Sequence, residues 1–221
     1  MRLFFKTIKN FIRETDKILL LLCAVTSAFG CVSVLSATLW SASEGSKVTR
    51  DFLVMLFAVC AGLTIALIIS LIDYEFIIKM APLIGLFCIG IMIITLLFGV
   101  GPAERPDAKT WLKIGNTGIF FQPSEIVKIG FIITFGVHLE KLKGNINHIF
   151  SIIQLAIHAL IPIALVTISG DMGSALVFLM IFAIMMFMAG IKLRYFAVAL
   201  LTVVAAFPIV WVKVFNNIQR D

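Results

Sequence analysis

The sequence carries little charge for its length. Only 14% of its 221 residues are charged, whereas 61% are hydrophobic, and the mean hydropathy is +1.12. Soluble domains contain about 25% charged residues. A soluble fold could not bury this much apolar surface, so the composition excludes a soluble globular protein and indicates one that is integral to a membrane.

Residues that bind metals or form disulfides are also scarce. The four cysteines, Cys23, Cys31, Cys60 and Cys88, lie inside apolar runs, where cysteine behaves as a small hydrophobic side chain. The three histidines have no partners at metal-ligand spacing. We therefore predict no metal site built from histidine and cysteine. The net charge of +6 comes from basic residues that flank apolar runs, which argues against a nucleic-acid partner.

Seven hydrophobic runs predict an all-α bundle of transmembrane helices in a single membrane domain over residues 1–221. The runs lie near 18–40, 52–72, 81–100, 124–138, 149–168, 173–190 and 195–215. The first is too long for a signal peptide, because about 23 residues can cross roughly 30 Å of hydrocarbon. The fourth is the weakest, because about 15 helical residues reach only ~22 Å.

The distribution of lysine and arginine predicts a cytoplasmic N-terminus. This orientation places ten basic residues on the cytoplasmic side, in the N-terminal segment and the loops 73–80, 139–148 and 191–194. Seven lie on the opposite side. The excess follows the positive-inside rule.

A polar loop rich in glycine and proline, residues 101–125, leads into the fourth run. Pro123 suits the first position of a helix, because its missing N–H costs nothing there. Glu125 then lies in the first turn, where a carboxylate favours the helix dipole and can reach free N–H groups. Lys128, three residues later, can face Glu125 on one side of the helix. A structural ion pair and a functional pair both remain open.

A second polar island, residues 169–174, interrupts a stretch that is otherwise apolar from 149 to 189. About 40 helical residues would overshoot the bilayer, so a turn is expected here. Gly170 and Gly173 would supply backbone freedom, and Asp171 could cap the next helix or face a polar cavity. Both roles remain open for Asp171.

The histidines suggest structural roles. His158 lies within the fifth run, where a hydrogen-bonded structural role is favoured over a proton relay. His138 and His148 flank the loop containing Lys141 and are expected to be interfacial.

Three elements in order resemble the shape, elongation, division and sporulation (SEDS) family, which includes RodA, FtsW and SpoVE. The first two are Ala108-Lys109-Thr110-Trp111-Leu112 with Ile114-Gly115, and Phe121-Gln122-Pro123-Ser124-Glu125 with Lys128. The third is Gly170-Asp171-Met172-Gly173-Ser174-Ala175, between two spans. The resemblance covers essentially the whole chain.

The resemblance implies a peptidoglycan glycosyltransferase of about ten spans in the bacterial cytoplasmic membrane. Such enzymes polymerise lipid II and work with a class B penicillin-binding protein that crosslinks the strands. By this likeness Glu125 and Lys128 match a charged pair beside the central cavity. Trp111, Gln122 and Ser124 match the outer loop and its exit, and Asp171 matches a second acidic position.

The family's catalytic aspartate lies in a large outer loop after the seventh span. The final residues, 218–221, resemble the start of that loop, so the catalytic residue is expected beyond residue 221, and no catalytic role is transferred to Asp221. The diphosphate leaving group calls for positive charge or a divalent cation. Two alternatives to a polymerase are a lipid II flippase or transporter, and a non-catalytic membrane scaffold for the penicillin-binding protein.

Overall fold

The computed structural model describes residues 16–39, 50–70, 72–102, 105–115, 119–198 and 201. These residues fall into two compact units, Met1–Phe76 and Ile77–Asp221, which are described separately. The single membrane domain over 1–221 stays a prediction beside this division. The basic residues at 2–13 and the chain end at 218–221 lie outside the described residues.

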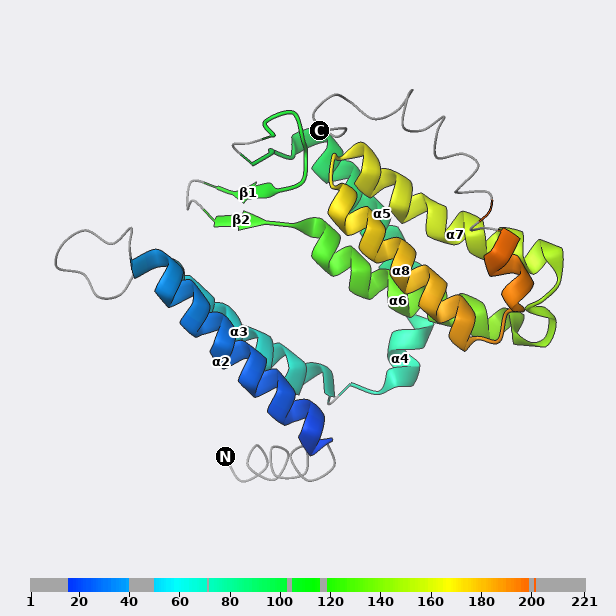
Figure 1. Cartoon of the computed structure of the whole chain (residues 1–221), viewed down its shortest axis with the longest axis horizontal. Coiled ribbons are helices and arrows are strands. Elements are labelled where there is room, and N and C mark those ends of the chain that lie inside the picture. The colour runs from blue at the N-terminus through cyan, green and yellow to red at the C-terminus, as the bar shows by residue number, and fades with distance from the viewer. Residues whose placement is uncertain are drawn as a thin grey trace. The chain divides into compact units, whose positions relative to one another are not determined.

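The first unit is a helical hairpin. Helix α2 spans Lys17–Leu39 and helix α3 spans Arg50–Ser70, and the two lie side by side (Figure 1). The Asp16 carboxylate accepts a hydrogen bond from the N–H of Ile18 at 2.8 Å and so caps α2. Both helices expose large apolar side chains, including Phe29 (72% exposed) and Phe57 (75%). Such surfaces suit contact with lipid.

The second unit is a bundle in which α6 contacts three other helices. Helix α4 (Tyr74–Lys79) crosses the boundary between the units and is followed by α5 (Ala81–Phe98), α6 (Pro123–Leu142), α7 (Ile149–Ile168) and α8 (Met172–Met188). A 3₁₀ turn, η1 (Lys143–Asn145), links α6 to α7. Helix α6 packs against α5, α7 and α8.

The core of this bundle is small and apolar. Its fully buried side chains include Phe135 and Phe178, and the Phe131 ring stacks on Phe135 with centroids 5.1 Å apart. Many other large apolar side chains of these helices are exposed. The bundle therefore buries its larger side chains around α6 and leaves an apolar exterior, as a membrane-embedded protein does.

Most of the predicted apolar runs correspond to helices. Among the described helices, three are long and apolar enough to cross a membrane: Lys17–Thr38, Ala81–Phe98 and Ile149–Ile168. Asp51–Ala66 and Met172–Met188 are shorter apolar helices. With these helices, the chain is a polytopic helical membrane protein. The last predicted run, 195–215, lies mostly outside the described residues, although 193–198 are helical.

Helix α6 is longer than the run predicted at 124–138. It has 20 residues, about 30 Å at 1.5 Å per residue, because the helix continues through the polar residues up to Leu142. Hydropathy finds where a helix is apolar, not where it ends. The helix therefore extends past the apolar run, and the span predicted at 124–138 stays a prediction.

One small sheet adds to the all-α architecture. Strands β1 (Leu112–Ile114) and β2 (Ile119–Phe121) pair antiparallel, with Leu112 opposite Phe121. The hairpin stands at the end of the bundle where α6 begins (Figure 1). It places residue 111 just before β1 and residue 122 just after β2, so the two ends of the hairpin lie close together.

Candidate functional site

The site begins at the start of α6. Gln122 has extended backbone angles, φ −100° and ψ 104°, and is the residue from which the helix starts, while Pro123 occupies its first turn. The predicted role of Pro123 is confirmed, because a residue without an N–H loses nothing at this position. The Gln122 side chain makes no capping bond to its own helix. Its amide is free to contact another element.

The turn between α7 and α8 supplies that other element. Asp171 caps α8, since its Oδ1 accepts a hydrogen bond from the N–H of Ser174 at 2.9 Å. Gly170 has φ +89°, and a Cβ at this position would lie 3.0 Å from the Cβ of Ala108. Glycine is required here both for the backbone angle and for the close approach. Gly173, by contrast, lies inside α8, so the backbone freedom predicted for it is not used.

A hydrogen bond joins the two polar islands of the sequence. The Gln122 Nε2 donates to Asp171 Oδ2 at 2.7 Å, across a separation of 49 residues. The N–H of Lys109 donates to the carbonyl oxygen of Ser169 at 2.8 Å, which holds the outer loop against the same turn. Asp171 therefore both caps a helix and lies in a polar site, the two roles left open above.

These contacts line a cavity of about 330 Å³. Trp111, Gln122 and Asp171 all line it, so three of the predicted site residues come together. The backbone of Trp111 is fixed by two hydrogen bonds to Val100, at 2.8 and 3.1 Å. The cavity combines a carboxylate, an amide and an indole, a set that can bind a polar ligand with apolar faces.

Arg105 also lines this cavity, and sequence reasoning missed it. In the sequence it is one cation of a polar loop, with nothing to set it apart from Lys109 or Lys113. The N–H of Arg105 donates to Pro102 O at 3.0 Å and that of Ala108 donates to Arg105 O at 3.1 Å, and Arg105 lines the same cavity as Asp171. A guanidinium gives the cavity a donor set suited to phosphate oxygens.

The predicted charged pair forms, but it does not line this cavity. Lys128 Nζ lies 2.8 Å from Glu125 Oε1, with the Lys128 side chain 18% exposed and that of Glu125 58% exposed. The Glu125 carboxylate thus accepts a hydrogen bond from Lys128. Ser124, the other predicted residue of this turn, is buried with no hydrogen-bond partner for its Oγ among the described residues.

The histidines show one difference from prediction. His158 is hydrogen-bonded, as expected, because its Nε2 lies 3.2 Å from Thr134 Oγ1. His138, expected to be a simple interfacial residue, instead has its Nδ1 3.0 Å from the Nδ1 of His158. The two positions are 20 residues apart, and only the packing of α6 on α7 brings them together. Within the described ranges, no three metal-ligating side chains form a cluster.

Comparison with known proteins places these residues in a family context. Residues 16–221 match the model of the cell cycle protein family FtsW, RodA and SpoVE. The chain is 29% identical over 212 residues to the peptidoglycan glycosyltransferase RodA of Treponema pallidum, covering 94% of this chain and 47% of that protein. It is 30% identical over 154 residues to a probable peptidoglycan glycosyltransferase FtsW of Legionella pneumophila, covering 69% of this chain and 38% of that protein.

Two solved structures share the fold. One comes from work on polymerization and crosslinking by a peptidoglycan synthase complex, with a TM-score of 0.71, 23% identity and coverage of 94% of this chain and 57% of that one. The other is a mutant of the rod shape determining protein RodA of Thermus thermophilus, with a TM-score of 0.69, 22% identity and coverage of 86% and 58%. The chain spans about half the length of the curated relatives it matches.

Proposed function

This chain belongs to the FtsW, RodA and SpoVE family, and we propose that the whole protein is a peptidoglycan glycosyltransferase that polymerises lipid II. The observation that carries the proposal is the cavity shared by Arg105, Trp111, Gln122 and Asp171. The names of the matched relatives, peptidoglycan glycosyltransferases RodA and FtsW, support the same activity. The protein would act in the bacterial cytoplasmic membrane with its N-terminus in the cytoplasm.

The cavity suits the head of a lipid-linked disaccharide. A guanidinium binds diphosphate oxygens through paired N–H donors. The Trp111 indole offers an apolar face for a sugar ring and an N–H for a hydroxyl. Gln122 and Asp171 are held together by a 2.7 Å hydrogen bond, and their remaining lone pairs and donors would bind sugar hydroxyls. We propose that these four residues bind and position the substrate.

The reaction sets a clear chemical demand. The 4-hydroxyl of the incoming disaccharide attacks the anomeric carbon of the growing glycan, a new C–O bond forms, and the bond to the diphosphate breaks with its electron pair. A carboxylate base must take the hydroxyl proton. Asp171 already accepts two hydrogen bonds, one of them as a helix cap, and we assign it to positioning. The base is proposed to lie in a segment beyond residue 221.

A divalent cation at the diphosphate is part of this proposal, with Asp171 as its candidate protein ligand. Mg²⁺ is commonly held by one or two carboxylates together with substrate phosphates and water. The described lining of the cavity offers one carboxylate, so it fits an ion that arrives with the diphosphate and not a closed protein site. When bound, such an ion would neutralise charge on the leaving group.

The charged pair Glu125 and Lys128 lies one turn beyond Gln122 on α6. We propose that it acts beside the substrate cavity, as the family resemblance implies. A class B penicillin-binding protein is proposed as the partner that crosslinks the product.

The test is polymerisation of lipid II by the full-length gene product with its crosslinking partner. Arg105→Gln should lower the rate at least tenfold, because one charge-assisted contact to a phosphate contributes about 1.5–3 kcal/mol. Lys113→Gln is the matched control: Lys113 is an exposed cation of β1 in the same loop and does not line the cavity, so its rate should be unchanged. Equal rates for both variants would remove the cavity from the mechanism. If lipid II translocation fell with Arg105→Gln while polymerisation persisted, the flippase alternative would replace this proposal.

A further inference from the structure

A second cavity lies at the other end of the bundle. It has a volume of about 490 Å³, and its polar lining consists of Lys79, Thr134, His138, Lys141 and His158. Helix α6 starts beside the Gln122–Asp171 contact and ends at Leu142, so Lys141 is separated from that contact by nearly the full helix. The two cavities share no lining residue.

The charge of this second cavity is of one sign. Lys79 lies in the last turn of α4 and Lys141 in the last turn of α6, and among the described residues no aspartate or glutamate lines the cavity. In the described part of the chain neither lysine forms a salt bridge. The nearby Glu140 is 3.7 Å from Lys143, outside the lining. Two ammonium groups at one cavity, without a carboxylate in its lining, call for an anionic ligand.

The two histidines form a chain of hydrogen bonds with Thr134. The Thr134 Oγ1 lies 3.2 Å from the carbonyl oxygen of Phe131 and 3.2 Å from His158 Nε2. The His158 Nδ1 lies 3.0 Å from the Nδ1 of His138, so one of these two nitrogens donates a hydrogen bond and the other accepts it. The Nε2 of His138 is left without a partner among the described residues, so it can contact a ligand.

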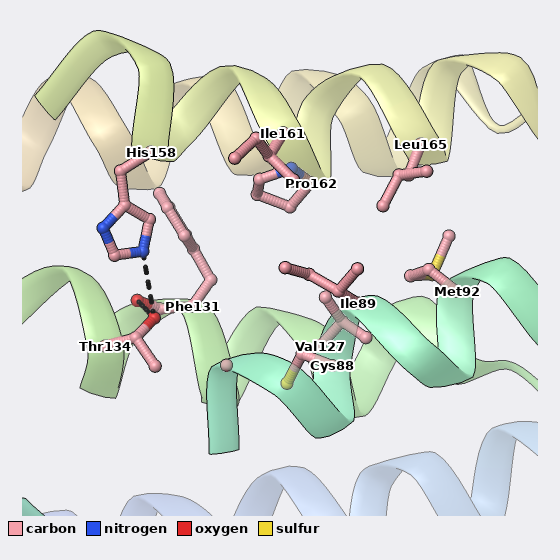
Figure 2. A pocket seen from close by; sticks show the side chains of 11 residues that line it. Cys88, Ile89, Met92, Val127, Phe131, Thr134, His158, Ile161, Pro162 and Leu165 are labelled. Carbon is pink, nitrogen blue, oxygen red and sulfur yellow. Dashed lines mark hydrogen bonds between the residues drawn. The ribbon is translucent and has the colours of Figure 1, made fainter. Parts of the chain in front are cut away.

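A small apolar groove with a volume of about 60 Å³ adjoins this cavity. It shares Gly85, Thr134 and His158 with the charged cavity. Figure 2 shows Ile161, Pro162 and Leu165 of α7 facing Ile89 and Met92 of α5, with His158 and Thr134 at one end. Ile89 and Ile161 are exposed, so the groove opens on the outer surface of the helices. A ligand with an anionic head and an apolar tail matches both parts.

We propose that an anionic phospholipid of the bilayer binds here, with its phosphate at Lys79, Lys141 and His138 and an acyl chain along the groove between α5 and α7. The positive charge of the cavity favours an anionic head group, and the adjoining apolar groove favours a lipid over a free anion. The site is independent of the proposed polymerase reaction. A lipid held between α4, α5, α6 and α7 would tie the ends of these helices together at the membrane surface.

The experiment measures lipid binding to the purified full chain in neutral detergent by native mass spectrometry. Phosphatidylglycerol is titrated against zwitterionic phosphatidylcholine, for the intact chain and for a Lys79→Gln, Lys141→Gln double variant. An exposed ion pair between one lysine and the lipid phosphate contributes up to about fivefold, so the double variant should bind phosphatidylglycerol about 25-fold more weakly. A Lys143→Gln, Lys192→Gln variant removes the same charge from exposed positions outside the cavity and should bind like the intact chain.

Two further arms identify the source of the phosphate. Glycerol phosphate and inorganic phosphate, added at millimolar concentration, should fail to displace phosphatidylglycerol, because they lack the chain that occupies the groove. Displacement by either would overturn the lipid assignment in favour of a soluble phosphate. Equal binding by the cavity and control variants, or equal binding of the two lipids, would overturn the site itself.

Discussion

Removing Asp171 should destabilise the protein through two separable contacts. Asp171→Ala loses the cap of α8, which costs about 1 kcal/mol. It also loses the charge-assisted hydrogen bond from Gln122, which contributes about 1.5 kcal/mol, the low end of the range, because the pair is only partly buried. The expected decrease in the free energy of unfolding is therefore about 2.5 kcal/mol. The measurement is reversible unfolding of the full chain in mixed micelles.

Asp171→Asn separates the cap from the charge. Asparagine caps helices about as well as aspartate, so its amide oxygen can still accept from the N–H of Ser174. The asparagine Nδ2 then faces Gln122 as a donor, so the Gln122 amide has to turn and present its Oε1 as the acceptor of a weaker, neutral hydrogen bond. The decrease in the free energy of unfolding should stay below about 1 kcal/mol. A matched control is Asp107→Ala, since Asp107 is an exposed acid of the outer loop and should change stability by less than about 0.5 kcal/mol.

A double-mutant cycle isolates the contact with Gln122. Gln122→Ala and Asp171→Ala should couple by about 1 kcal/mol or more, because either change alone removes the 2.7 Å bond. A coupling energy of zero would refute the tie between the start of α6 and the turn before α8. A cost below about 0.5 kcal/mol for Asp171→Ala would refute the cap as well.

Three further changes test other parts of the structure. Gly170→Ala should lower the free energy of unfolding by about 1–3 kcal/mol, since the residue has φ +89° and its Cβ would press on Ala108. The control is Gly190→Ala, which should cost less, because Gly190 has φ +86° but open space around its Cβ. Equal costs for the two variants would show that packing against Ala108 contributes nothing. Glu125→Gln should change the free energy of unfolding by no more than about 0.5 kcal/mol, because the Glu125 side chain is 58% exposed. The same variant should reduce lipid II polymerisation by the full-length protein at least tenfold. Unchanged polymerisation would show that the Glu125–Lys128 pair is structural. Thr134→Val should cost about 1 kcal/mol in unfolding titrations by ending the hydrogen-bond chain of the two histidines, and no loss would contradict that chain.

Several features of the fold could be predicted from local sequence. The apolar run at 149–168 coincides with α7, Ile149–Ile168, because hydropathy and the length needed to cross a bilayer are properties of one segment. The start of α6 at Pro123 and the cap at Asp171 were also predictable, since helix ends depend on a few neighbouring residues. The motifs at 108–128 and 170–175 indicated the family, which the match over 16–221 confirms.

The end of α6 could not be predicted from the apolar run alone. The apolar run ends near 138, but the helix continues to Leu142, because Glu140 and Lys141 are good helix formers that need no apolar environment. The apolar composition of a segment indicates which residues contact lipid, whereas an α-helix can continue through polar residues. The cavity residue Arg105 was missed for a similar reason, since nothing in its neighbours shows which way a loop folds.

The sequence by itself determined that this is a polytopic helical membrane protein of one family, with two polar islands that carry the family's motifs. Tertiary structure alone decided that these islands meet, through Gln122 and Asp171, at a cavity that also contains Arg105. It alone decided that His138 contacts His158 beside two lysines at the opposite end. The physical reason is that hydropathy and capping act within one helix, whereas these contacts join residues 20 to 49 positions apart and depend on how the helices pack.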